Sequence, residues 1–397
     1  MEESISNYTN AVGSGKQAIT QRQKRKGGRG MREGWEYKKL GDLCDIYQPK
    51  TLATEQLVAD GKYYVYGANG IIGRYNDYNH EQSEILLTCR GATCGTINIS
   101  QPYSWINGNA MVIHRKSEDL SFDFLKYLML SLDYSLIITG AAQPQITRQK
   151  IAPIIVKFPS LSVQQSIVSE LDKINELICL KKEQLCDYDK LAQSLFYEMF
   201  GDPVENEKGW EVKKLGEIGE LARGVSKHRP RNAPELLGGT MPLIQTGDVA
   251  NANFYIRDYT QTYSELGVAQ SKVWRKGTLC ITIAATIGKC AILDFTACFP
   301  DSVVGFKPKE SIETIFMYFI FSNMQKMLED FAPGVAQKNI NLKILNDLDI
   351  PIPPLSLQQL FASRITQIEA LKSEIQRTIR DLETLLASRM QYWFFGF

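Results

Sequence analysis

A tandem duplication constrains the fold of this chain more than any other feature of its sequence. Residues 34–46, GWEYKKLGDLCDI, recur as residues 209–221, GWEVKKLGEIGEL, and seven of the first eight positions are identical. Three more pairs of segments keep their order: Ala92–Gly95 with Ala285–Gly288, Ala142–Ile146 with Ala336–Ile340, and Leu161–Gln165 with Leu355–Gln359. The offset grows from 175 to 193 or 194, so the second copy has some 18 extra residues near its start. A repeat of this length predicts two copies of one folded unit.

Each copy divides into a globular part and a long helix. Gly-rich turns and short β-branched strands such as Glu84–Thr88 indicate a mixed α/β domain in the first part. Prolines end this part, because the residue before a proline is disfavoured in the α conformation. Residues 161–200 and 355–397 then follow a helical pattern. Ser162 and Ser356 stand where N-caps are expected, with a Gln three residues later, as in a capping box.

Apolar residues form a narrow seam along both helices, in steps of four and three. The first helix has Ile167, Leu171, Ile174, Ile178, Leu185, Tyr188, Ala192, Leu195 and Met199, and the second has Phe361, Ile365, Ile368, Leu371, Ile375, Ile379, Leu382, Leu386, Met390 and Trp393. Such a seam is typical of a helix paired with another helix. The alternative is one face of an ordinary core helix, but roughly 35 residues rising 1.5 Å each span about 50 Å. We expect the two helices to pair antiparallel.

The sequence thus predicts an α+β fold. Two duplicated mixed α/β domains are separated by two long antiparallel coiled-coil helices, and a pseudo-twofold axis relates the copies. The expected segments are a basic disordered tail (1–33), the first domain (34–160), the first long helix (161–200), a linker (201–208), the second domain (209–354) and the second long helix (355–397). The tail has seven Lys or Arg and three Glu, with few apolar residues. With no apolar leader and no apolar run of about 18 residues, we expect a cytoplasmic protein outside membranes.

Motifs of catalysis are missing from the sequence. It has no G-x-x-x-x-G-K-[ST] phosphate loop, no G-x-S-x-G and no Asn-Pro-Pro-aromatic motif of adenine methyltransferases. Nuclease-like E-x-K fragments occur only in the repeated opening, at Glu36/Lys38 and Glu211/Lys213, which favours a scaffold role. Eight cysteines without C-x-x-C spacing and three scattered histidines predict reduced thiols rather than a metal site. We expect a chain that catalyses nothing itself and has neither metal nor cofactor.

Residues suited to DNA recognition gather in a few segments. Residues 62–80 interleave Tyr, Asn, Arg and Gly, which is typical of base-edge contacts and equally of an ordinary Tyr-rich turn. Residues 223–231 hold four cations and a histidine between Gly224 and Pro230, which indicates either a phosphate-binding loop or only a solvated face. The net charge is +1, so a DNA-binding chain would have to collect its cations on one face.

With these motifs the chain resembles the specificity subunits of type I restriction-modification systems, over nearly everything from residue 34 onward. The resemblance rests on the repeated GW-x-x-KKLG, on Val65–Gly73, on Pro242–Asp248, on Cys89–Gly95 with Ala284–Gly288, and on Pro-x-Leu-Ser-x-Gln-Gln before each long helix. It implies two target recognition domains that each read half of a split site on double-stranded DNA. It also implies paired helices that set the gap and dock two methyltransferase subunits, with restriction/translocase subunits completing the complex.

Candidate DNA contacts come from both copies. They are Asn69, Arg74, Tyr75, Asn76, Arg90, Gln143, Gln145 and Arg148 in the first, and Arg223, Lys227, Arg229, Arg231, Gln245, Thr246, Asp248, Lys289, Gln337 and Lys338 in the second. A base contact by Arg90 would not transfer to the second copy, which has Ala284 near that position. Two other classes stay open: the DNA-reading portion of another restriction or methylation enzyme, and a coiled-coil adaptor whose domains bind protein instead of DNA.

Overall fold

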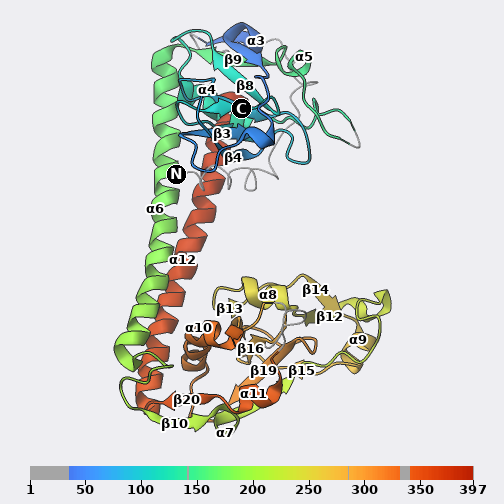
Figure 1. Ribbon diagram of the computed structural model, residues 1–397, viewed down its shortest axis with the longest axis vertical. Helices are drawn as coiled ribbons and strands as arrows, with labels where there is room; N and C mark the ends of the chain where they lie inside the picture. Colours follow the sequence, from blue (N-terminus) through green and yellow to red (C-terminus); the bar gives the residue numbers. More distant parts are fainter. Residues whose placement is uncertain (1–34, 141–142, 285, 331–339, 397) are drawn as a thin grey trace. The chain divides into compact units, whose positions relative to one another are not determined.

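The computed structural model describes residues 35–140, 143–284, 286–330 and 340–396, which form two compact units (Figure 1). Unit 1 is the described part of Met1–Glu183 together with that of Ile375–Phe397, and unit 2 is the described part of Gln184–Glu374. Each unit therefore combines one globular domain with half of each long helix.

Unit 1 contains three small sheets. The first sheet is the antiparallel pair of β1 (Trp35–Lys39) and β9 (Ile155–Pro159). The second sheet has four strands in the order β2 (Cys44–Tyr47), β8 (Ala110–Arg115), β5 (Ile85–Thr88) and β6 (Ile97–Ile99). The third sheet has the order β4 (Gly70–Tyr75), β3 (Tyr63–Gly67) and β7 (Trp105–Ile106). The helices of this domain are α3 (Leu40–Leu43), η1 (Thr54–Gln56), α4 (Phe122–Ser131) and α5 (Arg148–Ile151). Strand β5 lies in the middle of the four-stranded sheet and is buried along its whole length, in agreement with its apolar sequence.

Unit 2 repeats this plan with additions. One sheet is the pair of β10 (Glu211–Lys214) and β20 (Asp349–Ile352). A second sheet has the order β11 (Gly219–Arg223), β19 (Val303–Pro308), β16 (Leu279–Thr282), β17 (Cys290–Leu293) and β13 (Tyr255–Ile256). A third has the order β14 (Gln261–Tyr263), β12 (Leu237–Leu243), β18 (Ala297–Cys298) and β15 (Val273–Trp274). Its helices are α7 (Leu215–Ile218), η2 (Pro234–Leu236), α8 (Thr246–Asn251), α9 (Glu265–Ala269), α10 (Thr314–Asp330) and α11 (Leu342–Asn346). The duplicated mixed α/β domain is therefore confirmed, and among the elements that the structure describes, α8, β13, α9 and β15 have no counterpart in the first copy.

The two long helices, α6 (Leu161–Phe200) and α12 (Leu355–Phe394), lie side by side within each unit (Figure 1). In unit 1, Glu170 pairs with Arg389 and Lys182 pairs with Glu383; in unit 2, Asp189 pairs with Lys372 and the ring of Phe196 packs on that of Phe361. Along these contacts the residue numbers in α6 increase while those of their partners in α12 decrease. The two helices therefore pair antiparallel, as expected. Among the helices that the structure describes, none has the length and apolar character that a membrane crossing needs.

One seam position differs from the sequence expectation. Leu371 is 44% exposed, whereas its neighbour Lys372 is only 4% exposed and occupies the seam between Ile368 and Ile375. The Lys372 ammonium pairs with Asp189 of α6 at 2.7 Å and with Glu369 at 2.6 Å. A buried charge is tolerated only when it is paired in this way. The hydrophobic pattern had placed the nearest leucine in the seam because it cannot identify a buried ion pair.

The start of each long helix also differs from the expectation. Helix α6 begins at Leu161, before Ser162, so the serine is not the N-cap. The residue that anchors this end is Gln164, which is fully buried. Its amide nitrogen donates to the carbonyl oxygens of Asp119 and Pro159, at 2.9 Å each, and its oxygen accepts from the Ser121 nitrogen at 2.8 Å.

Gln358 makes the equivalent contacts in the second copy. Its amide nitrogen donates to the Pro353 carbonyl at 2.8 Å, and its oxygen accepts from the Glu313 nitrogen at 3.0 Å. In both copies a buried glutamine therefore ties the first turn of the long helix to the backbone of its own domain.

Replacing Gln164 by alanine is expected to lower the free energy of unfolding of the full chain by about 2–4 kcal/mol, since it leaves one backbone group of a buried hydrogen bond and two of part-buried hydrogen bonds unpaired, at roughly 1–3 kcal/mol for a fully buried group. Urea unfolding followed by circular dichroism measures this. The adjacent Gln165 is exposed and provides a matched control, because Gln165→Ala should change stability by less than about 0.5 kcal/mol. Equal effects of the two substitutions would contradict the anchoring role.

Candidate nucleic-acid interface

Five loop segments of unit 1 meet beyond the end of strand β5. The Thr88 hydroxyl donates to the Ala68 carbonyl in the β3–β4 turn. The Cys89 nitrogen donates to the Asn109 carbonyl at 3.3 Å, and the Cys89 carbonyl accepts from the Ile146 nitrogen at 3.0 Å. We call the segments 48–51, 67–70, 88–96, 107–109 and 143–148 loop cluster 1. Its backbone groups satisfy one another, so its outward side chains are held on a fixed frame.

Several of the expected DNA contacts lie in loop cluster 1. Arg90 and Gln145 face each other across an antiparallel backbone bridge, which brings their side chains to adjacent positions. Both residues are exposed, as are Asn69, Gln143 and Arg148. Guanidinium and carboxamide groups are the side chains that most often pair with guanine and adenine edges. The structure thus brings these five residues, which lie far apart in the sequence, to one edge of the domain.

Arg74, Tyr75 and Asn76 lie elsewhere. They follow β4 to its far end, about 16 Å from Asn69 at the usual rise of a strand. The Arg74 guanidinium stacks on the ring of Tyr64 at 4.4 Å and donates to the Tyr64 hydroxyl at 2.9 Å. Tyr75 packs edge-on against Trp105. The contacts of Arg74 and Tyr75 hold the hairpin together, and Asn76 is exposed beside them.

Sequence reasoning missed two amide side chains of loop cluster 1, Gln48 and Asn109, which are both exposed. The Gln48 amide nitrogen donates to the Gly108 carbonyl at 2.7 Å and to the Cys89 sulfur at 3.1 Å. Gln48 directly follows strand β2, and the equivalent position in the second copy is Arg223, the last residue of strand β11. Extending the repeat beyond residue 46 would have matched Gln48 with Arg223, but side-chain similarity ends before that point.

Unit 2 has an equivalent loop cluster 2, made of residues 223–231, 283–284, 286–289, 299–302 and 340–341. The Ile283 nitrogen donates to the Ser302 carbonyl at 3.1 Å, and the Ile340 nitrogen donates to the Ile283 carbonyl at 3.1 Å, as Cys89 does with its two partners in unit 1. Arg223 reaches the Ile340 carbonyl at 3.5 Å, and Lys289 is exposed in the same cluster. Gln337 and Lys338 fall outside the described residues.

Gln245, Thr246 and Asp248 form the first turn of α8, apart from the basic loop. The Asp248 carboxylate accepts from the Gln245 nitrogen at 2.7 Å and caps the helix. The Gln245 amide contacts Gln261 at 3.2 Å, while Thr246 is half-buried. The carboxylate at Asp248 is thus explained by capping, since an acid at a helix N-terminus is favourable.

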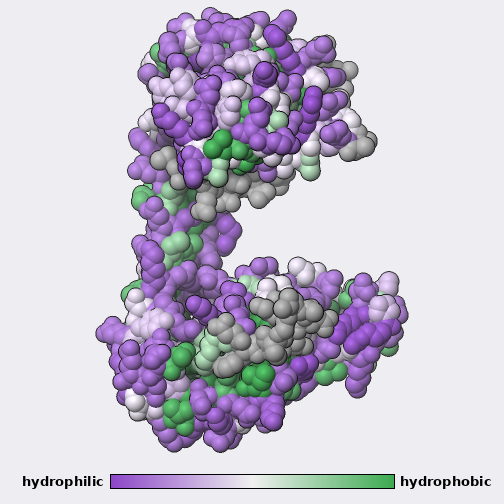
Figure 2. Space-filling view, viewed as in Figure 1, coloured by the Kyte–Doolittle hydropathy of each residue, from purple (hydrophilic) through white to green (hydrophobic). Residues whose placement is uncertain are grey.

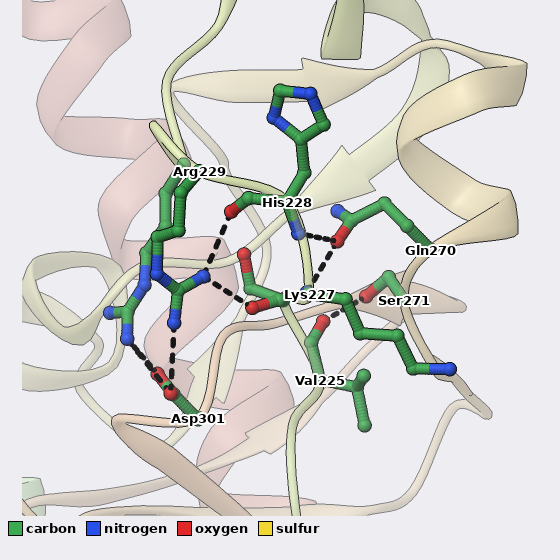
Figure 3. A network of polar contacts seen from close by, with 9 residues as sticks. Val225, Lys227, His228, Arg229, Gln270, Ser271 and Asp301 are labelled. Atoms are coloured by element: carbon green, nitrogen blue, oxygen red, sulfur yellow. Dashed lines mark hydrogen bonds and ion pairs between the residues drawn. The ribbon is translucent and has the colours of Figure 1, made fainter.

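The basic loop Arg223–Arg231 is ordered by its own polar contacts (Figure 3). The backbone nitrogens of Lys227 and His228 donate to the Gln270 side-chain oxygen at 2.6 Å and 3.1 Å. Arg229 donates to the carbonyls of Ser226 and His228 within the loop, at 2.6 Å and 2.8 Å. The Lys227 side chain points away from these contacts and is exposed (Figure 3). The four cations of the sequence pattern therefore have different environments.

Four buried cysteines among the described residues have thiols of low reactivity. Burial raises the pKa of Cys44 and Cys290 to about 12 and also raises that of Cys89 and Cys280, so these thiols stay protonated and weakly nucleophilic at neutral pH. All eight cysteines are free thiols. In the described part of the chain, no group of His, Cys, Asp or Glu is arranged to hold a metal ion. Most of the face that Figure 2 shows is hydrophilic, with hydrophobic residues gathered at a few places in each unit.

Comparison with known proteins identifies relatives over both copies. Residues 32–186 and 207–384 match the family model "Type I restriction modification DNA specificity domain". A Haemophilus influenzae protein with the provisional name of type I restriction enzyme specificity subunit is 24% identical over 363 residues, covering 86% of this chain and 89% of its own length.

Two solved structures share the fold over 92% of this chain and 98% of their own. One is the S subunit of a type I restriction-modification system from M. genitalium, with a TM-score of 0.53 at 16% identity. The other comes from work on complex assembly and conformational transition of the type I system, with a TM-score of 0.59 at 19% identity.

If loop cluster 2 contacts phosphates, Lys227→Ala should weaken duplex-DNA binding about equally on all sequences. One lost phosphate contact should reduce the slope of log K against log salt by about one unit. Fluorescence anisotropy at several salt concentrations measures both quantities. Lys309→Ala serves as the control, because Lys309 follows β19 at the end opposite to loop cluster 2 and is equally exposed. Identical slopes for the two variants would show that Lys227 is only solvated.

Proposed function

Because the chain belongs to the family of type I restriction-modification DNA specificity subunits, which recognise DNA without catalysing a reaction, we propose that it reads a split, asymmetric DNA site and docks the methyltransferase and restriction subunits. In this proposal each domain reads one half of the site through its loop cluster. Two methyltransferase subunits bind the long helices, and restriction/translocase subunits complete the complex, which acts in the cytoplasm. Methylation and cleavage are carried out by these partners.

The observation that carries the proposal is one frame with two different sets of side chains. Loop clusters 1 and 2 are built by equivalent backbone hydrogen bonds. Loop cluster 1 presents amides together with Lys50, Arg90 and Arg148, whereas loop cluster 2 presents arginines, lysines and, among its described residues, one carboxylate, Asp301. Base choice depends on which donors and acceptors reach the groove edge, so different side chains on one frame select different half-sites.

Exposed leucines on the long helices support the docking part of the proposal. Leu177 and Leu191 of α6 are 48% and 50% exposed, and their equivalents in α12, Leu371 and Leu385, are 44% and 45% exposed. In unit 1, Leu177 lies between two residues that contact α12, and Leu385 lies between their partners. In unit 2, Leu191 and Leu371 are placed likewise.

Each unit therefore carries one leucine from each helix at the same level of the pair. Apolar side chains at repeated helical positions favour protein contacts over solvent. Because the two pairs are equivalent, they suit two copies of one partner, as two methyltransferase subunits would require.

Exchanging residues 34–160 for the equivalent domain of a relative is the direct test of the reading mode. The chimera should change one half of the methylated sequence and leave the other half and the gap unchanged, because the second domain and both helices are retained. Methylome sequencing of cells that carry the chimera and its methyltransferase measures the site. A palindromic site in the parent, or a change in both halves of the chimera, would contradict independent reading.

The docking surface is tested by Leu177→Glu combined with Leu371→Glu, one change in each unit. Losing one buried leucine at an interface costs roughly 1.5–3 kcal/mol, so the affinity for each methyltransferase subunit should fall about 10- to 100-fold. Co-purification and analytical ultracentrifugation follow the loss. Leu136→Glu with Leu266→Glu, at exposed leucines outside the two long helices, is the matched control. Retention of the methyltransferase by the helix variant, with unchanged melting, would place the contact elsewhere.

A further inference from the structure

An acidic residue lies within the most basic loop cluster of the chain. Two guanidinium groups converge on Asp301 (Figure 3), and the contacts identify them as those of Arg229 and Arg231. Asp301 follows Pro300, whose carbonyl lies so close to Gly224 that a Cβ there would meet it at 2.4 Å. The carboxylate is therefore held against the start of the basic loop by the backbone path.

The two arginines use their donors differently. One terminal nitrogen of Arg229 donates to two carbonyl oxygens of its own loop, and the other terminal nitrogen lies 3.9 Å from the Asp301 carboxylate. Arg231 contacts Asp301 with a single terminal nitrogen, Nη2, at 2.7 Å and 2.8 Å from the two carboxylate oxygens. Within the described part of the chain, Nη1 and Nε of Arg231 have no partner. Arg229 thus shapes the loop, whereas Arg231 is fixed at one corner and keeps donors for another molecule.

A carboxylate at this place does not suit a site that only grips phosphates. It repels the DNA backbone and cancels one of the cations beside it. It does suit a site that must hold a guanidinium plane in one orientation, because base readout depends on the direction of the donors and not on charge alone. Loop cluster 1 has Gly108 at the position equivalent to Asp301, so only the second domain has this arrangement.

We propose that Arg231, oriented by Asp301, donates to a guanine edge in the half-site read by unit 2. The proposal rests on the proposed function and deepens it, since it assigns a base-reading residue and a positioning residue to one domain. Guanine presents N7 and O6 as acceptors in the major groove, and its N7 suits a hydrogen bond from Nη1 of Arg231, the terminal nitrogen that Asp301 leaves free. Among the described residues, the side-chain partners of Asp301 are Arg231 and Arg229, and Asp301 acts through them.

The test begins with the methylated site of the wild-type complex, which fixes the guanines of each half-site. Duplexes with 7-deazaguanine at one guanine at a time lack the N7 acceptor and are compared by competition binding to the full chain with its methyltransferase. We expect one guanine of the half-site of unit 2 to be sensitive, with a loss of about 5- to 150-fold. In Arg231→Lys this sensitivity should shrink to less than about twofold, because an ammonium lacks the planar pair of donors.

Asp301→Asn separates base reading from simple charge. It removes a negative charge, so binding to unrelated DNA should stay equal or tighten, while the preference for guanine at the sensitive position falls. Arg257→Lys is the matched control, because Arg257 pairs with Asp294 at 3.6 Å in the same unit and has a similar exposure. It should leave the sensitivity unchanged.

Three results would overturn the proposal: equal 7-deazaguanine penalties in wild type and Arg231→Lys, an unchanged base preference in Asp301→Asn, or a half-site of unit 2 without guanine. The failure of the proposed function looks different, because the wild-type complex itself would then show no split site and no sequence preference. That result would remove this proposal as well, independently of the variants.

Discussion

The antiparallel seam between α6 and α12 is the constraint on which both units depend. In each unit the globular domain packs on half of this pair; in unit 2, Phe196 of α6, Phe361 of α12 and Phe319 of α10 form one aromatic cluster with ring centroids 5.0–5.7 Å apart. The domain core and the seam are thus parts of the same apolar interior. The buried Lys372 pairs with Asp189 and so helps to fix the register of the two helices. A shift of one helix along the other would separate the Lys372 ammonium from the Asp189 carboxylate.

Backbone contacts and side-chain display are separated in this fold. The loops beyond β5 and β16 are held by main-chain hydrogen bonds that recur in both copies, so their frame depends little on which side chains they carry. Their side chains are then free to differ, as Gln48 and Arg223 do at equivalent positions. A protein that must recognise many different sequences with one architecture needs this separation, because a change in recognition then costs little stability.

Much of this could be predicted from the sequence, and the failures have physical causes. The duplication follows from the order of the repeated segments, the two long helices follow from periodicity, and the family is indicated by the resemblance of the repeated motifs. Lys372 was not placed in the seam because a pattern of apolar residues cannot show an ion pair. Arg74 was grouped with Asn69 because they are close in sequence, but a strand carries them to opposite ends. The pairing of Arg231 with Asp301 spans 70 residues, and no local pattern predicts it.

The buried glutamines at the helix starts have a consequence for how such chains diversify. Gln164 contacts only main-chain atoms of its domain, the Ser121 nitrogen and the carbonyls of Asp119 and Pro159, and Gln358 does the same in the second copy. Since every residue type offers a backbone carbonyl and every type except proline offers a backbone N–H, these hydrogen bonds make no other demand on the side chains of the domain that they hold. Genetic recombination that brings in a foreign domain with the same backbone path therefore meets a ready-made attachment, and new recognition can arise by inheritance of whole modules instead of by gradual substitution.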